Sequence, residues 1–330
     1  MEPDETLLAR PLDEKDKKIL RALFKNARAS YASIAKSVRL SKESVAYRIK
    51  RLQQQGFLTG FNTIIDVKKL GWEMYLIALK LRNIDIETEQ AILTKLETHP
   101  HIAWLVRCIG TYDIVLKLFA KDRMQMVEIM KDIEDEFKEY IDTYERNLLT
   151  EEYAVPFSFL YTEEDPVFTL KQTDAKATVD ATDAKLLSLL ANNARIPLAT
   201  AAANLNVTRD FLKYRLARLE KESIIINYRP DVWPKKLGYN WYLVSLQLGK
   251  LSPSLEQQLN SFLLNHPNVT YFYKTIGTAD IQIELRIKTR MELNDVLMEL
   301  RSLLKTVLKR HELLMILREH TYTYFPACMQ

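Results

Sequence analysis

The stretch "SKESVAYRIKRLQQQG", residues 41–56, has the pattern of one short helix with two different faces. It begins at Ser41, a residue type that commonly caps a helix N-terminus, and it ends at Gly56, which can adopt the left-handed conformation that closes a helix. One face is apolar, because its residues recur at steps of four and three. These residues are Val45, Ile49 and Leu52. The opposite face is polar and basic, and consists of Lys42, Ser44, Tyr47, Arg48 and Arg51.

Two shorter helices are predicted before this one. Asp13 is a plausible N-cap for the first helix, which ends at the Asn-Ala-Arg run of residues 26–28. A second helix is predicted over 31–37, and a tight turn leads from it into the third. The segment "FLTGFNTII", residues 57–65, then predicts a short β-wing. This order is the winged helix-turn-helix pattern, whose last helix enters the major groove of DNA. The candidate DNA-binding residues of this helix are Ser41, Lys42, Ser44, Tyr47, Arg48 and Arg51.

The pattern occurs twice in the chain, at a constant offset of 167 residues. The match runs from residue 12 to about residue 130 without a gap, and four of the seven glycines fall into register. A tandem duplication of a unit of about 150 residues is the simplest explanation. Matching pairs include Asp13 and Asp180, Tyr47 and Tyr214, His99 and His266, and Asp113 and Asp280.

The second helix-turn-helix keeps the core pattern but has a less basic outer face. Thr208 takes the place of the N-cap serine, and the outer face carries Arg209, Tyr214, Arg215 and Arg218. Residues 12–61 contain twelve Lys or Arg and four Asp or Glu, a net charge of +8, whereas residues 179–228 contain seven and five, a net charge of +2. A concentrated positive charge is the electrostatic footprint of phosphate binding. We therefore expect both modules to fold, and the first to bind double-stranded DNA more strongly.

The second part of each unit predicts a small α/β sandwich. In the first unit, the predicted elements are strands over 72–81, 102–109, 113–120 and 141–149 and helices over 87–98 and 123–138. That order is βαββαβ, the ferredoxin-like arrangement. Both faces of the first strand are apolar, so the sheet needs a second sheet to cover it. The duplicated copy can supply that sheet within the same chain, which predicts an intramolecular pseudo-dimer and, beyond it, association of chains.

The fold class is therefore α+β, with two tandem copies of a winged helix-turn-helix followed by a ferredoxin-like sandwich. The predicted domains are a winged helix-turn-helix at 12–66, a ferredoxin-like ligand-binding and oligomerisation domain at 67–161, a linker at 162–178, a second winged helix-turn-helix with a weaker DNA face at 179–233 and a second ferredoxin-like domain at 234–326.

These features resemble the Lrp/AsnC, or feast/famine, transcriptional regulators. The resemblance covers roughly residues 12–155 and 179–320, and it implies a sequence-specific DNA-binding regulator that responds to an amino acid or a similar small ligand. Family members usually have one unit per chain and dimerise, whereas this chain carries two. The motifs that carry the resemblance are the opening at 12–20, Asn26-Ala27-Arg28, Leu40-Ser41, Arg48-x-x-Arg51-Leu52 and Gly110-Thr111-Tyr112-Asp113.

The resemblance also implies a ligand site near the Gly-x-x-Asp turn, at contacts between subunits. The candidate residues are Gly110, Thr111, Tyr112 and Asp113, together with Gly277, Thr278 and Asp280. Backbone N–H groups at a glycine turn suit a carboxylate, and an aspartate suits an ammonium group. The alternative is a purely structural turn, in which glycine allows a positive φ and aspartate makes a local hydrogen bond.

A further polar stripe, Gln282, Glu284 and Arg286, alternates with apolar residues in "DIQIELRI". It either lines a ligand cavity or, as we favour, forms a wet or exposed sheet face. With only two cysteines, Cys108 and Cys328, a disulfide scaffold is excluded, and no spacing predicts a metal site, a cofactor or catalysis. No apolar run is long enough to span a membrane, and the N-terminus lacks the layout of a secretion signal, so a cytoplasmic protein is expected.

One enzyme remains as an alternative to the regulator. The architecture also resembles the sirohaem decarboxylases of tetrapyrrole metabolism, whose two related subunits pair much as these two units could. The weak DNA face of the second module fits that alternative, whereas the +8 charge of the first module has no use in a decarboxylase. We therefore expect a regulator rather than an enzyme.

Overall fold

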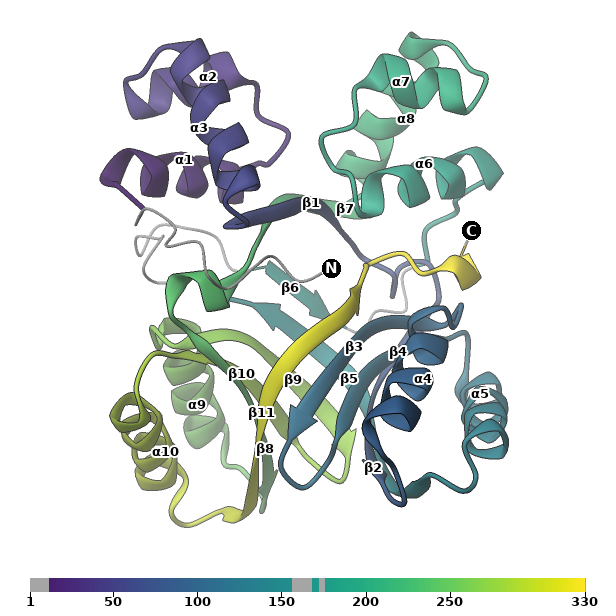
Figure 1. Cartoon of the computed structure of the whole chain (residues 1–330), viewed down its shortest axis with the longest axis vertical. Helices are drawn as coiled ribbons and strands as arrows, with labels where there is room; N and C mark the ends of the chain where they lie inside the picture. The colour runs from purple at the N-terminus through teal and green to yellow at the C-terminus, as the bar shows by residue number, and fades with distance from the viewer. Residues whose placement is uncertain (1–11, 156–167, 172–175, 330) are drawn as a thin grey trace. The chain divides into compact units, whose positions relative to one another are not determined.

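The computed structural model describes residues 12–155, 168–171 and 176–329 (Figure 1). The chain divides into two compact units. The first, called here the helical unit, contains residues 12–66 and 179–239. The second, called here the sheet unit, contains residues 67–155, 168–171, 176–178 and 240–329. Each unit therefore combines one part from each half of the duplicated sequence.

The helical unit contains the two predicted three-helix modules, and this part of the prediction is confirmed. The first module consists of α1 (Glu14–Lys25), α2 (Tyr31–Val38) and α3 (Lys42–Gln54), and the second of α6 (Ala181–Ala191), α7 (Leu198–Asn204) and α8 (Arg209–Lys221). Side-chain caps begin five of these helices: Asp13, Ser30, Ser41, Asp180 and Thr208. The predicted inner face of α3 is buried, as is that of α8. The helical period of the sequence therefore places the core correctly.

The strand predicted as a wing is present, but it does not form a wing within its own module. Strand β1 (Leu58–Ile65) pairs with β7 (Ile225–Val232), the corresponding strand of the other module. The pair is antiparallel, with Leu58 opposite Val232 and Ile65 opposite Ile225. A lone strand must satisfy its backbone N–H and C=O groups, and the duplicated copy supplies the partner. In Figure 1 the two helical modules lie on either side of this ribbon.

The sheet unit contains two βαββαβ halves, which also confirms the prediction. The first half is β2 (Glu73–Leu81), α4 (Ile86–Glu97), β3 (Ile102–Ile109), β4 (Ile114–Ala120), α5 (Arg123–Glu136) and β5 (Ile141–Ala154). The second half is β8 (Asn240–Leu248), α9 (Pro253–Asn265), β9 (Val269–Gly277), β10 (Ile281–Ile287), α10 (Arg290–Leu304) and β11 (Leu308–Tyr322). Two short 3-10 helices are also present, Pro234–Leu237 in the helical unit and Ala327–Met329 in the sheet unit.

The two halves join at both edges of their sheets. Strand β11 pairs with β3, β5 pairs with β9, and β2 also pairs with β5, so eight antiparallel strands form a closed ring. Strand β5 extends to Ala154, beyond the predicted end at residue 149, because its C-terminal residues pair with β9 of the other half. Closing the ring removes the exposed strand edges that would otherwise pair with other chains.

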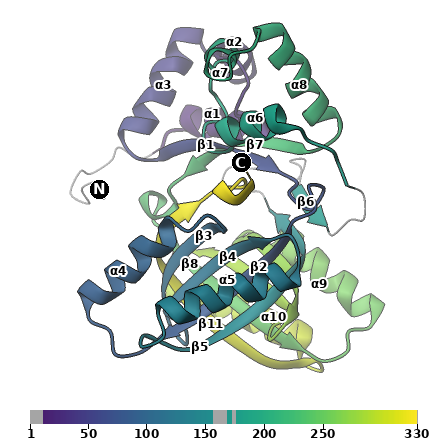
Figure 2. The same cartoon turned by 90° about the vertical axis from the view of Figure 1, so that its right-hand side faces the viewer.

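The four helices of the sheet unit cover the outside of this ring. Figure 1 shows α4 and α5 on one side and α9 and α10 on the opposite side. Tyr75, Ile77 and Leu79 of β2 pack in the core beneath α4 and α5. Met74 and Leu76 are buried as well, and they point to the other face of the strand, which is the inner face of the ring. Figure 2 shows α5 lying across the strands of its own half.

The polar stripe on β10 corrects one expectation. Gln282, Glu284 and Arg286 are all buried, so the favoured interpretation as an exposed sheet face is wrong. Glu284 accepts hydrogen bonds from Trp241 Nε1 (3.0 Å) and from the Tyr273 hydroxyl. The Arg286 guanidinium lies 3.7 Å from the centroid of the Trp241 ring, a cation–π contact. Closure of the ring withdraws this face of β10 from water. The alternation of polar and apolar residues in the sequence does not show that closure.

The segment predicted as a linker contains a strand. Residues Phe168–Lys171 form β6, which pairs antiparallel with β5 from Glu151 to Ala154. Most of the rest of the predicted linker lies outside the described residues. None of the helices in residues 12–155, 168–171 and 176–329 combines the length and the apolar character that a membrane span requires.

Candidate nucleic-acid interface

The outer faces of α3 and α8 present the residues that the sequence assigns to DNA binding. Tyr47 and Tyr214, at equivalent positions, are each 68% exposed. Lys42 and Arg209, which directly follow the caps, are exposed too. Ser44 of α3 is partly exposed. These side chains are available to a groove in the way the prediction requires, and their contact with DNA stays a prediction.

The arginines of the first module lie differently from the expectation. Arg48 Nη1 donates to Asp13 Oδ2 (2.7 Å) and to Asp16 Oδ1 (2.8 Å), and Arg51 Nη2 donates to Asp16 Oδ2 (2.5 Å). Asp16 is only 1% exposed. The two guanidinium groups therefore point at the first turn of α1 rather than at the outer edge of α3.

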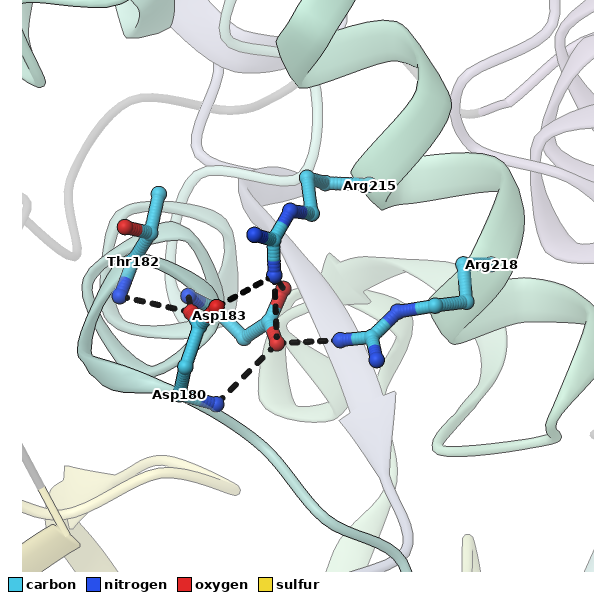
Figure 3. Close-up of polar contacts among 5 residues, drawn as sticks. All are labelled: Asp180, Thr182, Asp183, Arg215 and Arg218. Atoms are coloured by element: carbon cyan, nitrogen blue, oxygen red, sulfur yellow. Dashed lines mark hydrogen bonds and ion pairs between the residues drawn. The ribbon is translucent and has the colours of Figure 1, made fainter.

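The second module repeats this arrangement (Figure 3). Arg215 Nη1 donates to Asp180 Oδ2 (2.5 Å) and contacts Asp183 at 3.3 Å, and Arg218 Nη2 donates to Asp183 Oδ2. Asp183 is fully buried. The charge pairs fasten each recognition helix to the N-terminus of the first helix of its module, where a negative charge also suits the helix dipole. We call these two groups the aspartate–arginine locks: Asp13, Asp16, Arg48 and Arg51, and Asp180, Asp183, Arg215 and Arg218.

The locks shift the acidity of their exposed carboxylates. Burial acts to raise the pKa of Asp13, but the hydrogen bonds from Arg48 and from the Asp16 N–H outweigh it and lower the pKa to about 2. The pKa of Asp180 is also lowered, chiefly by the Asp183 N–H and despite some burial. Both carboxylates are therefore charged at neutral pH, as the ion pairs require.

The two helical modules are also joined by reciprocal contacts. The Ala27 N–H donates to the Tyr228 carbonyl, and the Ala194 N–H donates to the Phe61 carbonyl, both at 2.8 Å. These two bonds are related by the offset of 167 residues. The side chains that follow the alanines complete the contact: Arg28 Nη1 donates to the Ala194 carbonyl (2.5 Å), and Arg195 Nη1 donates to the Ala27 carbonyl. The Asn-Ala-Arg runs thus hold the modules together as a symmetric pair.

The basic residues around the turn are distributed unequally. Lys36, Arg39 and Lys50 are exposed in the first module. The corresponding positions of the second module hold Ala203, Asn206 and Ala217, which carry no charge. These three positions account for half of the six charges by which the two modules differ.

The aspartates of the two Gly-x-x-Asp turns bind the main chain. Asp113 Oδ2 accepts from the Leu81 N–H (2.7 Å) and Oδ1 from Lys80 Nζ (3.1 Å). Asp280 Oδ2 likewise accepts from the Leu248 N–H at 2.7 Å. This geometry is that of the structural-turn alternative, because the carboxylates already hold the ends of β2 and β8.

The glycines of these turns approach the long strand of the other half. A Cβ on Gly110 would come within 2.7 Å of the Leu314 side chain, and a Cβ on Gly277 would come within 2.4 Å of the Arg146 carbonyl. At the second turn, Asn147 Oδ1 accepts from the Ala279 N–H (2.9 Å), so the chain itself occupies a donor that a ligand carboxylate would use. The two turns are therefore not equivalent.

A small pocket lies inside the ring beside the first turn. Tyr112, Glu145, Ser245 and Gln282 are its polar lining residues. Gln282 Oε1 is buried and has no hydrogen-bond partner among the described residues. The remaining turn residues Gly110, Thr111 and Asp113 do not line this pocket, and Thr278 of the second turn instead donates to Glu145 Oε2 (2.9 Å). No three His, Cys, Asp or Glu side chains gather as a metal site would need within the described part of the chain.

Sequence reasoning missed three groups of residues: the buried partners Asp16 and Asp183, the Arg28 and Arg195 contacts between modules, and Asn147. Asp16, Arg48 and Arg51 recur in the second module at the offset of 167 residues, as Asp183, Arg215 and Arg218. This joint repetition is a signal that could have indicated the locks. Asn147 has no such signal, because its counterpart at the same offset is Leu314.

Comparisons with known proteins agree with the two helix-turn-helix modules. The model of the AsnC-type helix-turn-helix domain matches residues 12–53 and 179–220. Transcriptional regulator AzlB of Bacillus subtilis is 37% identical over 112 residues, which are 34% of this chain and 71% of that protein. Regulatory protein AsnC of Haemophilus influenzae is 32% identical over 108 residues, or 32% of this chain and 71% of that protein.

A similar fold over almost the whole chain occurs in a solved structure of the siroheme decarboxylase NirDL. That structure has a TM-score of 0.63 at 14% sequence identity, and the match covers 94% of this chain and 93% of that one. At this identity the likeness concerns the fold alone. The fold of the two joined halves therefore has a known counterpart, whereas each of the two sequence relatives matches about a third of the chain.

Proposed function

The chain belongs to the Lrp/AsnC family of transcriptional regulators, and we propose on this premise that it binds double-stranded DNA through its two AsnC-type modules. The observation that carries the proposal is the basic edge of the first module, where Lys36, Arg39, Lys42 and Lys50 are exposed around the turn and the recognition helix. Such a cluster suits phosphate contacts on both sides of a groove.

The test is a binding titration with DNA recovered from a random pool by the full-length chain. Four phosphate contacts would give a slope of about −4 in a plot of log affinity against log salt concentration. The double variant Lys36→Ala/Lys50→Ala should reduce the size of that slope by about two. Lys305→Ala, an exposed lysine of the sheet unit, serves as the matched control and should leave the slope unchanged. Recovery of no DNA above background would contradict the proposal.

We further propose that an amino acid or similar small ligand binds in the sheet unit, beside Tyr112. Two features support this: the Glu145 carboxylate, which suits an ammonium group, and the unpartnered Gln282 carboxamide oxygen in the same pocket. Thermal stabilisation by each of the twenty amino acids, for wild type and Glu145→Gln, tests it. A stabilising amino acid should lose its effect in the variant, and stabilisation by none of the twenty would refute the proposal.

Association of chains is proposed as well, because apolar side chains are exposed at equivalent positions of the two halves. Ile109 and Ile276 form one such pair, and Met124 and Met291 the other. Light scattering should give a mass that is a multiple of one chain, and a monomer at micromolar concentration would oppose it. A regulator of this kind would act in the cytoplasm, where DNA is accessible.

One observation favours a second candidate function, the siroheme-decarboxylase-like enzyme, namely the fold likeness to NirDL over 94% of the chain. We do not expect this activity. Inside the ring, Lys117 and Glu152 form a buried pair at 3.1 Å, and the Trp104 and Trp241 rings pack 5.9 Å apart. Purified protein is expected to lack haem absorbance and to leave the spectrum of added haem unchanged. A stoichiometric spectral shift would instead support the enzyme.

A further inference from the structure

We infer that the DNA site read by one chain is not a palindrome, and that Phe211 recognises the methyl group of a thymine in one half-site only. This inference rests on the proposed function, since it concerns how the two modules would read DNA. To that function it adds the type of DNA site, which is not a palindrome, and one residue that determines specificity, which is Phe211.

The helical unit has the symmetry of a palindrome reader in its backbone. The β1–β7 register and the reciprocal bonds of Ala27 and Ala194 relate the modules by a two-fold operation. Such a pair presents its two recognition helices to two half-sites in inverted orientation, as a homodimer does. In a homodimer the half-sites are identical, because the side chains are identical. Here one chain supplies both helices, so the side chains are free to differ.

The side chains of the two recognition helices differ at a position where base contacts are made. The N-terminal residues of a recognition helix contact base edges. The Ser44 N–H donates to the cap oxygen of Ser41 (3.1 Å), and the Phe211 N–H donates to the cap oxygen of Thr208 (3.3 Å). Ser44 and Phe211 therefore occupy the same position in the first turn. A hydroxyl can donate to or accept from any polar base edge, whereas a phenyl ring can do neither.

Phe211 is presented and held for such a contact. Its side chain is 38% exposed, which is unusual for phenylalanine on a helix that has a separate buried face. The Arg215 guanidinium lies 4.8 Å from the centroid of its ring, and Arg215 is itself held by Asp180. The ring thus packs against a cation that is itself held in place. In the major groove, the group that matches an exposed apolar side chain is the thymine C5-methyl.

The neighbouring positions strengthen the asymmetry. Lys50 of the first module corresponds to Ala217 of the second, and Arg39 corresponds to Asn206. The half-site of the first module is therefore held more by phosphate contacts, and that of the second more by the apolar contact. The salt dependence of binding should come mainly from the first half-site.

The first experiment selects DNA from a random pool with the full-length chain, with Phe211→Ser and with Ser44→Phe. Wild type should yield two unlike half-sites in inverted orientation. Phe211→Ser should change one half-site and leave the other unchanged, and Ser44→Phe should make the two half-sites more alike. A palindrome from wild type, or a single half-site, overturns the inference while the proposed function stands. Recovery of no DNA overturns both, which separates the two failures.

The second experiment removes the methyl group from the DNA instead of the ring from the protein. In the selected site, each thymine of the Phe211 half-site is replaced by uracil, which lacks only that methyl. Wild-type affinity should fall about fourfold, the value for one buried methyl-sized group, and the affinity of Phe211→Ser should not change. Lys305→Ala, an exposed lysine of the sheet unit, is the control and should keep the uracil penalty. An equal penalty in wild type and Phe211→Ser, or none in either, overturns the assignment.

Discussion

Replacing Asp16 by alanine should open the first helix-turn-helix module about a hundred times more often than in wild type. Asp16 is 1% exposed and accepts hydrogen bonds from Arg48, from Arg51 and from the Asp13 N–H. The substitution leaves two cations beside a buried position without their shared partner. Removing one member of a buried pair costs about 3–5 kcal/mol. The two guanidinium groups are about one-fifth exposed and can recover some water, so we expect about 3 kcal/mol.

The assay is hydrogen–deuterium exchange of peptides that cover α1 and α3 in the full-length chain. A loss of about 3 kcal/mol corresponds to a rise of about a hundredfold in the opening constant of these amides. Glu14→Ala is the matched control, because Glu14 lies in the same helical turn but its pair with Lys17 is exposed. That variant should change the opening constant by less than about fivefold. Asp183→Ala should produce the same effect in α6 and α8.

The reasoning would be refuted by similar exchange in Asp16→Ala and Glu14→Ala. Such a result would mean that the buried carboxylate contributes no more to the module than a surface charge does. The arginines would then be free to rotate toward DNA, as the sequence alone suggested. An intermediate rise in the opening constant of the α3 amides, with no change in those of α1, would also contradict a lock that joins the two helices.

Three further predictions concern charged side chains of both units. Arg48→Ala should weaken DNA binding by destabilising α3, without changing the slope of log affinity against log salt concentration. Lys50→Ala should reduce that slope by about one without loss of stability, and titrations at several salt concentrations distinguish the two variants. Asp113→Ala should lower the melting temperature by about 5 °C, and Asp280→Ala by a similar amount, because each carboxylate holds a main-chain N–H; an unchanged melting temperature would restore a ligand role. The lowered pKa of Asp13 means that its contribution is complete above about pH 4 and is lost as the pH falls towards 2, so the exchange of α1 should rise over that interval in wild type but not in Asp13→Asn.

Local patterns determined the secondary structure of this protein. The apolar spacing of α3, its serine cap and its closing glycine are all set by neighbours within four residues, so the helix could be predicted before any tertiary contact was known. The same holds for the βαββαβ order and for the duplication, which is a property of the sequence itself. The exposed edge residues Lys42 and Tyr47 were also predicted correctly as outward-facing, since helical period alone places them there.

Tertiary structure decided what the polar side chains do. Arg48 meets Asp13 and Asp16 across 35 and 32 residues of chain, and nothing in the period of α3 distinguishes it from a residue that faces solvent. The predicted wing became half of a ribbon, because its pairing partner lies in the duplicated module. Glu284 was expected at a wet surface and is buried, because ring closure depends on strand pairings between the two halves. Sequence periodicity specifies which face of an element is apolar, whereas the partner of a charge or of a strand edge depends on which distant segment the folded chain brings beside it.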